Sequence, residues 1–311
     1  RNQFQSPALF QPPTVSGNNE KMKDNRNQHY VPQYYLKNFS KNNLINIYDI
    51  KGKNRFSNSI RNTAFKKKYY NVNLELINNV LENESFKDVK IVDNLIRIYN
   101  ENVLSNFINS FNLPAKRIEN KDFLNTISII DTHSLVDFAL IQLYRNPKFF
   151  LFSKLIEDNL NVKIVDFGKT VNGIMLLLLI SKLHYKKEFV FKDQILKAFE
   201  PIIREFELIK KDITNSYKIM YLNYSDENFI TSDCPVGLVR HFNIDTFTLM
   251  TIPINPKILF CCFNKKAFPE FKDETSSKQI LTNESIEEVY NLNISTIANA
   301  TRFLYSIDGN F

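Results

Sequence analysis

The spacing of the apolar residues changes twice along this chain of 311 residues. Near the N-terminus they alternate in Leu44–Asp49, which predicts a strand, followed by a turn at Gly52. From about residue 90 to Lys211 they recur every three or four positions, as in helices that bury one face. Beyond Lys211, short apolar runs predict strands again. We therefore expect an α+β fold, with a mainly helical middle and a small antiparallel β-rich portion formed by N-terminal strands and C-terminal hairpins.

The clearest predicted helix is Lys121–Arg145, whose apolar stripe ends before Pro147. Other helices are expected over 91–108, 149–160, 170–187, 192–210 with a kink at Pro201, and Ser285–Thr301. Strands are expected over 66–72, Tyr217–Tyr224, Asn228–Thr231, Thr246–Ile254, Lys257–Phe263 and Phe303–Ser306. The Asn255–Pro256 pair predicts the turn of an antiparallel hairpin.

The composition is that of an ordinary globular protein, with 43% hydrophobic and 23% charged residues. We expect a flexible N-terminal arm over 1–28, rich in Gln, Asn, Pro and Ser, and a single α+β domain over 29–311. The longest apolar run, Ile174–Ile180, is far below the roughly 20 residues that a membrane span needs. These features predict a cytoplasmic protein with no membrane partner.

Several well-known kinds of site are disfavoured by the sequence. The six glycines form neither a phosphate loop nor a dinucleotide-binding fingerprint, and no serine-hydrolase elbow is present. Zinc is disfavoured because neither His-Glu-x-x-His nor paired Cys-x-x-Cys occurs. Cys261 and Cys262 are neighbours in a predicted strand, so they should point to opposite faces and cannot hold one metal ion together.

The formal net charge of +7 favours attraction to a polyanion, and RNA is the partner that we expect. Lysines and tyrosines are interleaved in the run from Lys66 to Tyr70, which makes Lys67 and Lys68 candidates for contact with nucleic acid. Basic runs are also common on solvated faces, and that interpretation stays open.

The first of three polar clusters contains His29 and Gln33, four residues apart. A histidine there can act as a general acid or base near neutral pH, and Gln33 can orient a substrate. Tyr35 is expected to face inward from a short helix that begins at Pro32, and it is a further substrate-binding candidate. The alternative is a histidine at a helix N-terminus with a structural amide.

The other two clusters stand at the ends of predicted elements. Gln142 and Arg145 close the strongest helix, where a guanidinium can bind a phosphate or merely complement the helix dipole. Ser232 and Asp233 follow an apolar strand, where the carboxylate can hold a metal ion, accept a proton or orient His29. Turn capping by Asp233 is the structural alternative.

Four motifs occur in a characteristic order. They are His29-Tyr30-Val31-Pro32-Gln33-x-Tyr35-Leu36-x-x-Phe39, Gln142-x-x-Arg145-x-Pro147, Phe229-Ile230-Thr231-Ser232-Asp233-x-Pro235, and Asn293 followed by Ala300-Thr301-Arg302-Phe303-Leu304-Tyr305-Ser306. Over roughly Gln28–Ser306 the chain resembles the bacterial domain-of-unknown-function family 4238. The family commonly has Asn at the position of Cys234, which argues against a thiol nucleophile there. The resemblance implies a soluble single-domain bacterial protein from phage defence or mobile-element biology, and it adds Asn293 and Arg302 to the candidate pocket.

Together these observations predict a nuclease-like effector that acts on RNA. If the protein is an enzyme, the expected class is a hydrolase that cleaves phosphodiester bonds. His29 is the expected acid or base, Arg145 binds the phosphate, Gln33 positions the substrate, and Asp233 orients His29 or holds a divalent metal ion. The expected substrate-binding residues are Gln142, Tyr35, Ser232, Asn293, Arg302, Lys67 and Lys68. The alternative is a non-enzymatic interaction or ligand-sensing protein, with a protein partner or as a homo-oligomer, in which the polar motifs form a structural hydrogen-bond network.

Overall fold

The computed structural model describes residues 27–69, 71–82, 132–145, 173–176, 178–179, 191–240, 246–269, 279–283 and 285–311. The predicted arm lies outside these residues apart from its last two positions, as do the helices expected over 91–108 and 149–160 and parts of those over 121–145 and 170–187. Strand β1 (Asn27–His29) opens the described fold. No helix within the described residues is long and apolar enough to cross a membrane.

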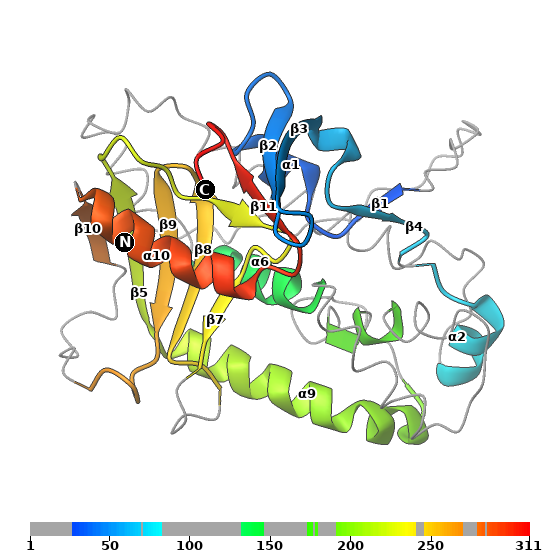
Figure 1. Cartoon of the computed structure of the whole chain (residues 1–311). Coiled ribbons are helices and arrows are strands. Elements are labelled where there is room, and N and C mark those ends of the chain that lie inside the picture. The colour runs from blue at the N-terminus through cyan, green and yellow to red at the C-terminus, as the bar shows by residue number, and fades with distance from the viewer. Residues whose placement is uncertain are drawn as a thin grey trace, which may run out of the picture.

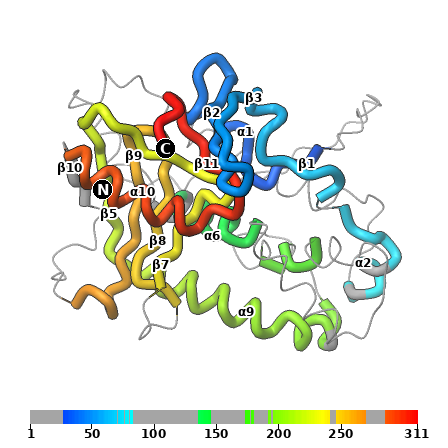
Figure 2. The backbone as a smooth tube through the Cα atoms, viewed as in Figure 1, coloured from blue at the N-terminus to red at the C-terminus, as the bar shows by residue number. Residues whose placement is uncertain are grey.

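A four-stranded antiparallel sheet joins segments from both ends of the chain. Its order is β3 (Asn54–Ser59), β2 (Leu44–Asp49), β11 (Phe303–Ser306) and β6 (Thr231–Ser232). The strands predicted for β2 and β11 are confirmed residue for residue. Figure 2 shows β11, in red, beside β2, in blue. The motifs that contain Thr231–Ser232 and Phe303–Ser306 therefore meet on one sheet, beside an N-terminal hairpin.

The turn predicted near Gly52 is also confirmed, and it connects β2 to β3. One carboxylate oxygen of Asp49 accepts the main-chain N–H groups of Lys51 and Gly52, at 3.1 and 3.0 Å. The polar strand β3 is the partner of β2, whereas the strand expected over 66–72 is shortened to β4 (Phe65–Lys67), which pairs with β1 in a separate two-stranded ribbon.

The second large sheet has five strands. Their order is β10 (Gln279–Asn283), β5 (Tyr217–Asn223), β9 (Ile258–Phe263), β8 (Leu249–Asn255) and β7 (Gly237–Val239). The hairpin predicted around Asn255–Pro256 is confirmed as the β8–β9 connection. All neighbours are antiparallel except β10 and β5, which run parallel. Cys261 and Cys262 belong to clusters on the two opposite faces, as alternation along a strand requires.

Helices cover both faces of this sheet (Figure 1). On one face Val289, from α10 (Ile286–Asn299), packs with Ile219 and Leu259. The main core on the other face includes residues of α9 (Asp193–Thr214) and α6 (Thr132–Arg145). Tyr144 of α6 meets Phe206 of α9 edge to face, with the ring centroids 5.3 Å apart. Buried residues recur along α9 every three or four positions, at Phe199, Ile202, Phe206, Ile209 and Ile213.

The α+β class is confirmed, but the expected balance between helices and strands is not borne out. Within the described residues the sheets are extensive, and helices α1 (Gln33–Lys37) and α2 (Leu74–Val80) are short. Of the strand expected over Asn228–Thr231, only Thr231 lies in a strand, the two-residue β6. The first part of the expected strand is irregular because the main chain at 228 and 230 bonds to the side chain of Asn293 in place of a neighbouring strand. Helix α9 continues through Pro201 and ends four residues beyond its predicted limit.

Candidate functional site

The imidazole of His29 is held in one tautomer. Its Nδ1 lies 3.0 Å from the carbonyl oxygen of Thr63, and its Nε2 lies 2.7 Å from Nε2 of Gln33. A carbonyl can only accept, so Nδ1 carries the proton and donates it, and Nε2 accepts from the Gln33 amide. The predicted contact between His29 and Gln33 is therefore present, although His29 ends β1 and Gln33 begins α1.

Electrostatics keep this histidine neutral. Burial lowers the pKa of His29 to about 4, the hydrogen bond to Thr63 opposes that shift, and the nearby positive charge of Arg145 lowers the pKa further. The side chain is half-buried and its partner Gln33 is exposed. The ring therefore presents a proton-accepting Nε2, close to the surface, throughout the physiological pH range.

Arg145 and Gln142 bind the main chain of the His29 segment. Arg145 Nη2 donates to the carbonyl of His29, and in the orientation that satisfies both its atoms the Gln142 amide donates to Tyr30 O and accepts from Arg145 Nη1, each at 3.2 Å. Both side chains are buried, and Arg145 is only 3% exposed. The structure thus brings together three of the predicted site residues, but the guanidinium contacts protein where a phosphate was expected.

Asp233 is bound to the chain that leads from α10 into β11. Oδ1 accepts Thr301 N–H at 2.8 Å and Oδ2 accepts Arg302 N–H at 3.0 Å. The side chain is 3% exposed, and burial raises the pKa of the carboxyl, against the opposing effect of these N–H groups. The partner of His29 Nδ1 is the Thr63 carbonyl, so the orienting role expected of Asp233 is filled by main chain.

Ser232 forms a local turn with Cys234. The Ser232 hydroxyl accepts Cys234 N–H at 3.0 Å and donates to the Cys234 carbonyl at 2.8 Å. Cys234 Sγ in turn lies 3.0 Å from Thr301 Oγ1. Both residues are fully buried, so this motif connects β6 with the start of β11.

Two further candidates, Tyr35 and Asn293, are buried and bonded to the main chain. The Tyr35 hydroxyl donates to Pro253 O at 2.6 Å and lies 2.8 Å from Thr231 Oγ1. Asn293 accepts Ile230 N–H at 3.1 Å and donates to the carbonyl of residue 228 at 3.0 Å. These contacts join α1 and α10 to the segment that contains β6.

Arg302 forms a bidentate ion pair with Asp49, a residue that sequence reasoning did not single out. Arg302 Nη2 lies 2.7 Å from Asp49 Oδ2, and Nε lies 3.1 Å from both carboxylate oxygens. The hydrogen bond from Arg302 is the largest influence that lowers the pKa of Asp49, to about 2, with the N–H groups of Gly52 and Lys51 adding to it. The Arg302 guanidinium also lies over the ring of Phe303 and remains 51% exposed.

Lys67 shares a face of the β1–β4 ribbon with His29. Lys67 pairs with Asn27 and Phe65 pairs with His29, so alternation places these four side chains on the same side. The rings of His29 and Phe65 are 5.7 Å apart. Lys68 follows in a turn, and both lysines are exposed. A neutral histidine and a cation thus stand on one exposed face.

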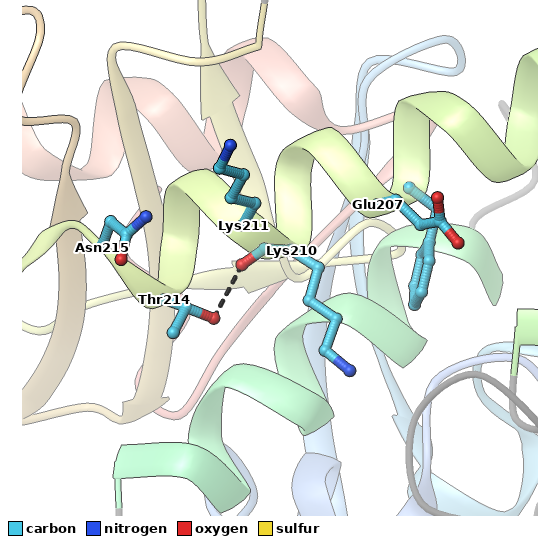
Figure 3. Close-up of a pocket in the computed structure, with 6 residues that line it drawn as sticks. Glu207, Lys210, Lys211, Thr214 and Asn215 are labelled. Carbon is cyan, nitrogen blue, oxygen red and sulfur yellow. Dashed lines mark hydrogen bonds between the residues drawn. The ribbon is translucent and has the colours of Figure 1, made fainter.

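Two surface hollows among the described residues are lined by residues outside the ribbon. One of about 360 Å³ is lined by Phe206, Glu207, Lys210, Lys211, Thr214 and Asn215, all at one end of α9. Figure 3 shows that Lys210 and Lys211 extend in different directions, so they do not converge on one ligand position. A second hollow includes Asn293. Across the described ranges no group of three or more His, Cys, Asp and Glu side chains could hold a metal ion.

Comparison with known families gives a match to the model described as "Protein of unknown function (DUF4238)", over residues 27–310. Neither the curated proteins nor the solved structures contain a significant match. The matched range begins at the first residue of β1 and reaches beyond β11, so it includes every strand of the ribbon and of the four-stranded sheet.

Proposed function

The chain belongs to the DUF4238 family over nearly its whole length, and from that premise we propose that it is an RNA-directed nuclease-like effector in which His29 is the general base. The observation that carries the proposal is the fixed tautomer of His29, whose Nε2 accepts a proton beside the exposed Gln33. A base oriented by a second group is the usual arrangement in enzymes that activate a hydroxyl.

The β1–β4 ribbon supplies the surroundings that such a substrate needs. Lys67 is exposed on the His29 face, where its ammonium group can neutralise a phosphate. Phe65 offers a ring on the same face for base stacking, next to a run of three lysines on a chain of net charge +7.

The proposed reaction requires only these groups and water. His29 Nε2 takes the proton of a ribose 2′-hydroxyl while the 2′-oxygen attacks the adjacent phosphorus. The bond from phosphorus to the 5′-oxygen breaks, and that oxygen receives a proton back from the imidazolium through water. The products are a 2′,3′-cyclic phosphate end and a 5′-hydroxyl end. Gln33, bonded to Nε2 in the free protein, positions the attacking hydroxyl.

Arg145 has a positioning role in this scheme. Its guanidinium fixes the carbonyl of His29, and its charge favours the neutral imidazole. We therefore assign the phosphate contact to Lys67, an exposed cation on the His29 face of the ribbon.

The test is cleavage of labelled single-stranded RNA by the purified chain, with and without magnesium. His29→Gln should lower the rate by about 10²–10⁴-fold, the usual contribution of a general base. Lys67→Ala should lower it less, and Lys51→Ala, which removes an exposed lysine from the β2–β3 turn, should leave it unchanged. Expression in a bacterial host should slow growth with the parent and not with His29→Gln.

The proposal fails if the folded parent leaves RNA intact under both conditions. It fails equally if His29→Gln, shown to be folded by circular dichroism, cleaves at the parent rate. A product with a 2′-hydroxyl next to a 3′-phosphate or 3′-hydroxyl end, formed without a cyclic intermediate, would exclude the 2′-oxygen as the nucleophile.

A non-enzymatic interaction or ligand-sensing protein is the second candidate. It is favoured by the partners of Arg145, Asp233, Asn293 and Tyr35, which include main-chain atoms of other segments in every case. Under this alternative, the parent binds a partner or a small ligand and is stabilised in a thermal melt, and no RNA is cleaved.

A further inference from the structure

Helix α10 exposes apolar side chains and buries polar ones, which is the reverse of an ordinary surface helix. Four large apolar side chains are exposed along it: Ile286 at 46%, Tyr290 at 52%, Ile294 at 58% and Ile297 at 44%. The residues that it buries include Asn293, Ser295 and Thr296, with Val289 as the buried apolar side chain. A surface helix normally places its apolar stripe toward the core, so this exposed stripe signals a partner.

The polar inner face of α10 is explained by how it docks on its own sheet. Ser295 Oγ lies 2.6 Å from Thr251 Oγ1, and the backbone of α10 approaches β7 so closely that a Cβ on Gly237 would lie 3.2 Å from the Ser295 carbonyl oxygen. Asn293 bonds to the segment before β6. The helix is therefore held by hydrogen bonds and close backbone contact, and the exposed isoleucines have no part in that docking.

The exposed stripe borders a groove. Tyr290 and Ile297 also line a hollow of about 270 Å³, whose other walls include Ile230, Arg55 and Phe311. The Arg55 guanidinium lies 5.9 Å from the ring centre of Tyr48 and 5.8 Å from that of Phe311, which fixes its position at the rim. Figure 1 shows α10 on the outside of the five-stranded sheet, so the stripe and the groove form one surface.

We propose that a second copy of this chain covers this surface, with the two α10 helices antiparallel about a two-fold axis. The apolar positions are spaced by four, four and three residues, so the row reads almost the same in both directions. An antiparallel pair then sets Ile286 against Ile297 of the second copy and Tyr290 against its Ile294, as an isologous contact requires.

Charge favours the same arrangement. Glu287 is exposed in the first turn of α10, and α10 itself contains no basic residue. Arg55 lines the groove together with Glu227, and it is in register with Tyr48 and Leu304, which follows the C-terminal end of the helix. Antiparallel pairing carries Glu287 of each copy toward Arg55 of the other. A parallel pair would instead bring the acidic first turns together.

Sedimentation of the full chain tests the pairing. The parent should sediment as a species of twice the chain mass of 36.6 kDa and dissociate on dilution. Ile294→Glu should shift it to a monomer, because it places a charge at the centre of the interface. Leu208→Glu is the matched control, since Leu208 is an exposed apolar residue on α9, and it should leave the dimer intact.

Charge-reversal variants and cysteine variants test the orientation of the two helices. Arg55→Glu and Glu287→Arg should each weaken the dimer at low salt, and the double variant should restore it. Oxidising a mixture of Tyr290→Cys and Ile294→Cys chains should give a cross-linked dimer more readily than either chain alone. The native cysteines are all buried and contribute little background.

A monomeric parent at all concentrations would overturn the proposal and leave the surface to a different partner. A dimer that Ile294→Glu leaves unchanged would overturn it as well.

Discussion

The guanidinium of Arg145 donates to the main-chain carbonyl of His29, which lies 116 residues earlier in the chain. This bond joins the end of α6 to the first described strand, and Gln142 adds a second bond to the next carbonyl. A buried cation is stable only while such partners remain, because its charge has been removed from water. The placement of His29 therefore depends on a side chain that does not touch its ring.

Replacing Arg145 by methionine should destabilise the protein by about 3 kcal/mol, since it leaves the carbonyl of His29 and the amide oxygen of Gln142 without their donor. Chemical denaturation would measure the loss. The control is Arg240→Met, which removes an ion pair to Glu205 of 2.7 Å whose members are 49% and 33% exposed. That change should cost less than about 1 kcal/mol. Equal effects of the two variants would contradict the proposed role of Arg145.

His29 should make folding sensitive to mild acid. Its pKa is about 4 in the folded protein and 6.5 as the ordinary value, so between these limits the unfolded chain binds the extra proton. The neutral His29 therefore contributes about 2 kcal/mol to the free energy of unfolding, once its partial exposure is allowed for. This contribution is fully present above pH 6.5 and is lost as the pH falls from 6.5 through 4. Denaturation of the parent and of His29→Gln between pH 7 and pH 4 should show a difference that narrows as the pH falls. A constant difference would contradict the lowered pKa.

Asp49 should titrate at a pH of about 2, and its pKa should rise toward 3.8 when Arg302 is replaced by glutamine. The rise is expected because the guanidinium stabilises the charged carboxylate. Carbon-detected NMR of the carboxyl group would measure both values. Since the folded pKa is lowered, the ion pair stabilises the protein above pH 3.8 and is lost as the pH falls through 2. An unchanged titration in Arg302→Gln would show that the turn N–H groups alone set the pKa.

The Tyr35 hydroxyl should be coupled to Thr231. Tyr35→Phe removes the donor to the Pro253 carbonyl and should cost about 1–2 kcal/mol. Thr231→Val should cost about 1 kcal/mol, and the double variant should cost less than the two single changes combined, since the threonine bond can be lost only once. A double-mutant cycle by urea denaturation gives the coupling energy, and strict additivity would contradict the bond.

Local patterns in the sequence predicted a strand or helix correctly where that element has a regular burial pattern and a residue that clearly ends it. The alternation in Leu44–Asp49 and the turn residues Asn255–Pro256 gave correct elements. Ser285 was correctly placed at the start of the closing helix, where its hydroxyl accepts Glu288 N–H. Strand β3 was missed because its residues Asn54–Ser59 are polar and it forms the edge of its sheet, where no apolar alternation is needed.

The sequence predicted the polar side chains of the candidate site but not the main-chain groups that they bind. His29, Gln33, Gln142 and Arg145 were singled out, and the structure brings them together. The partner of His29 Nδ1 could not be found, because it is the main-chain carbonyl of Thr63 and every residue has such a carbonyl. Asp49 was predicted only as the last residue of a strand that precedes a turn, and its pairing with Arg302 spans 253 positions that no local pattern connects.

The position of β11 between β2 and β6 has a consequence for how the chain is made. The ribosome releases Leu44–Asp49 long before it reaches Phe303–Ser306, so the early hairpin must wait for its central partner. Contacts so distant in the chain slow folding and leave strand edges open in the meantime. A chaperone that shields the hairpin of β2 and β3 during synthesis should therefore raise the yield of native protein. A prematurely terminated chain that ends before Arg302 would also lack the Arg302–Asp49 ion pair and the main-chain partners of Asp233, so the two ends of the fold would not be joined.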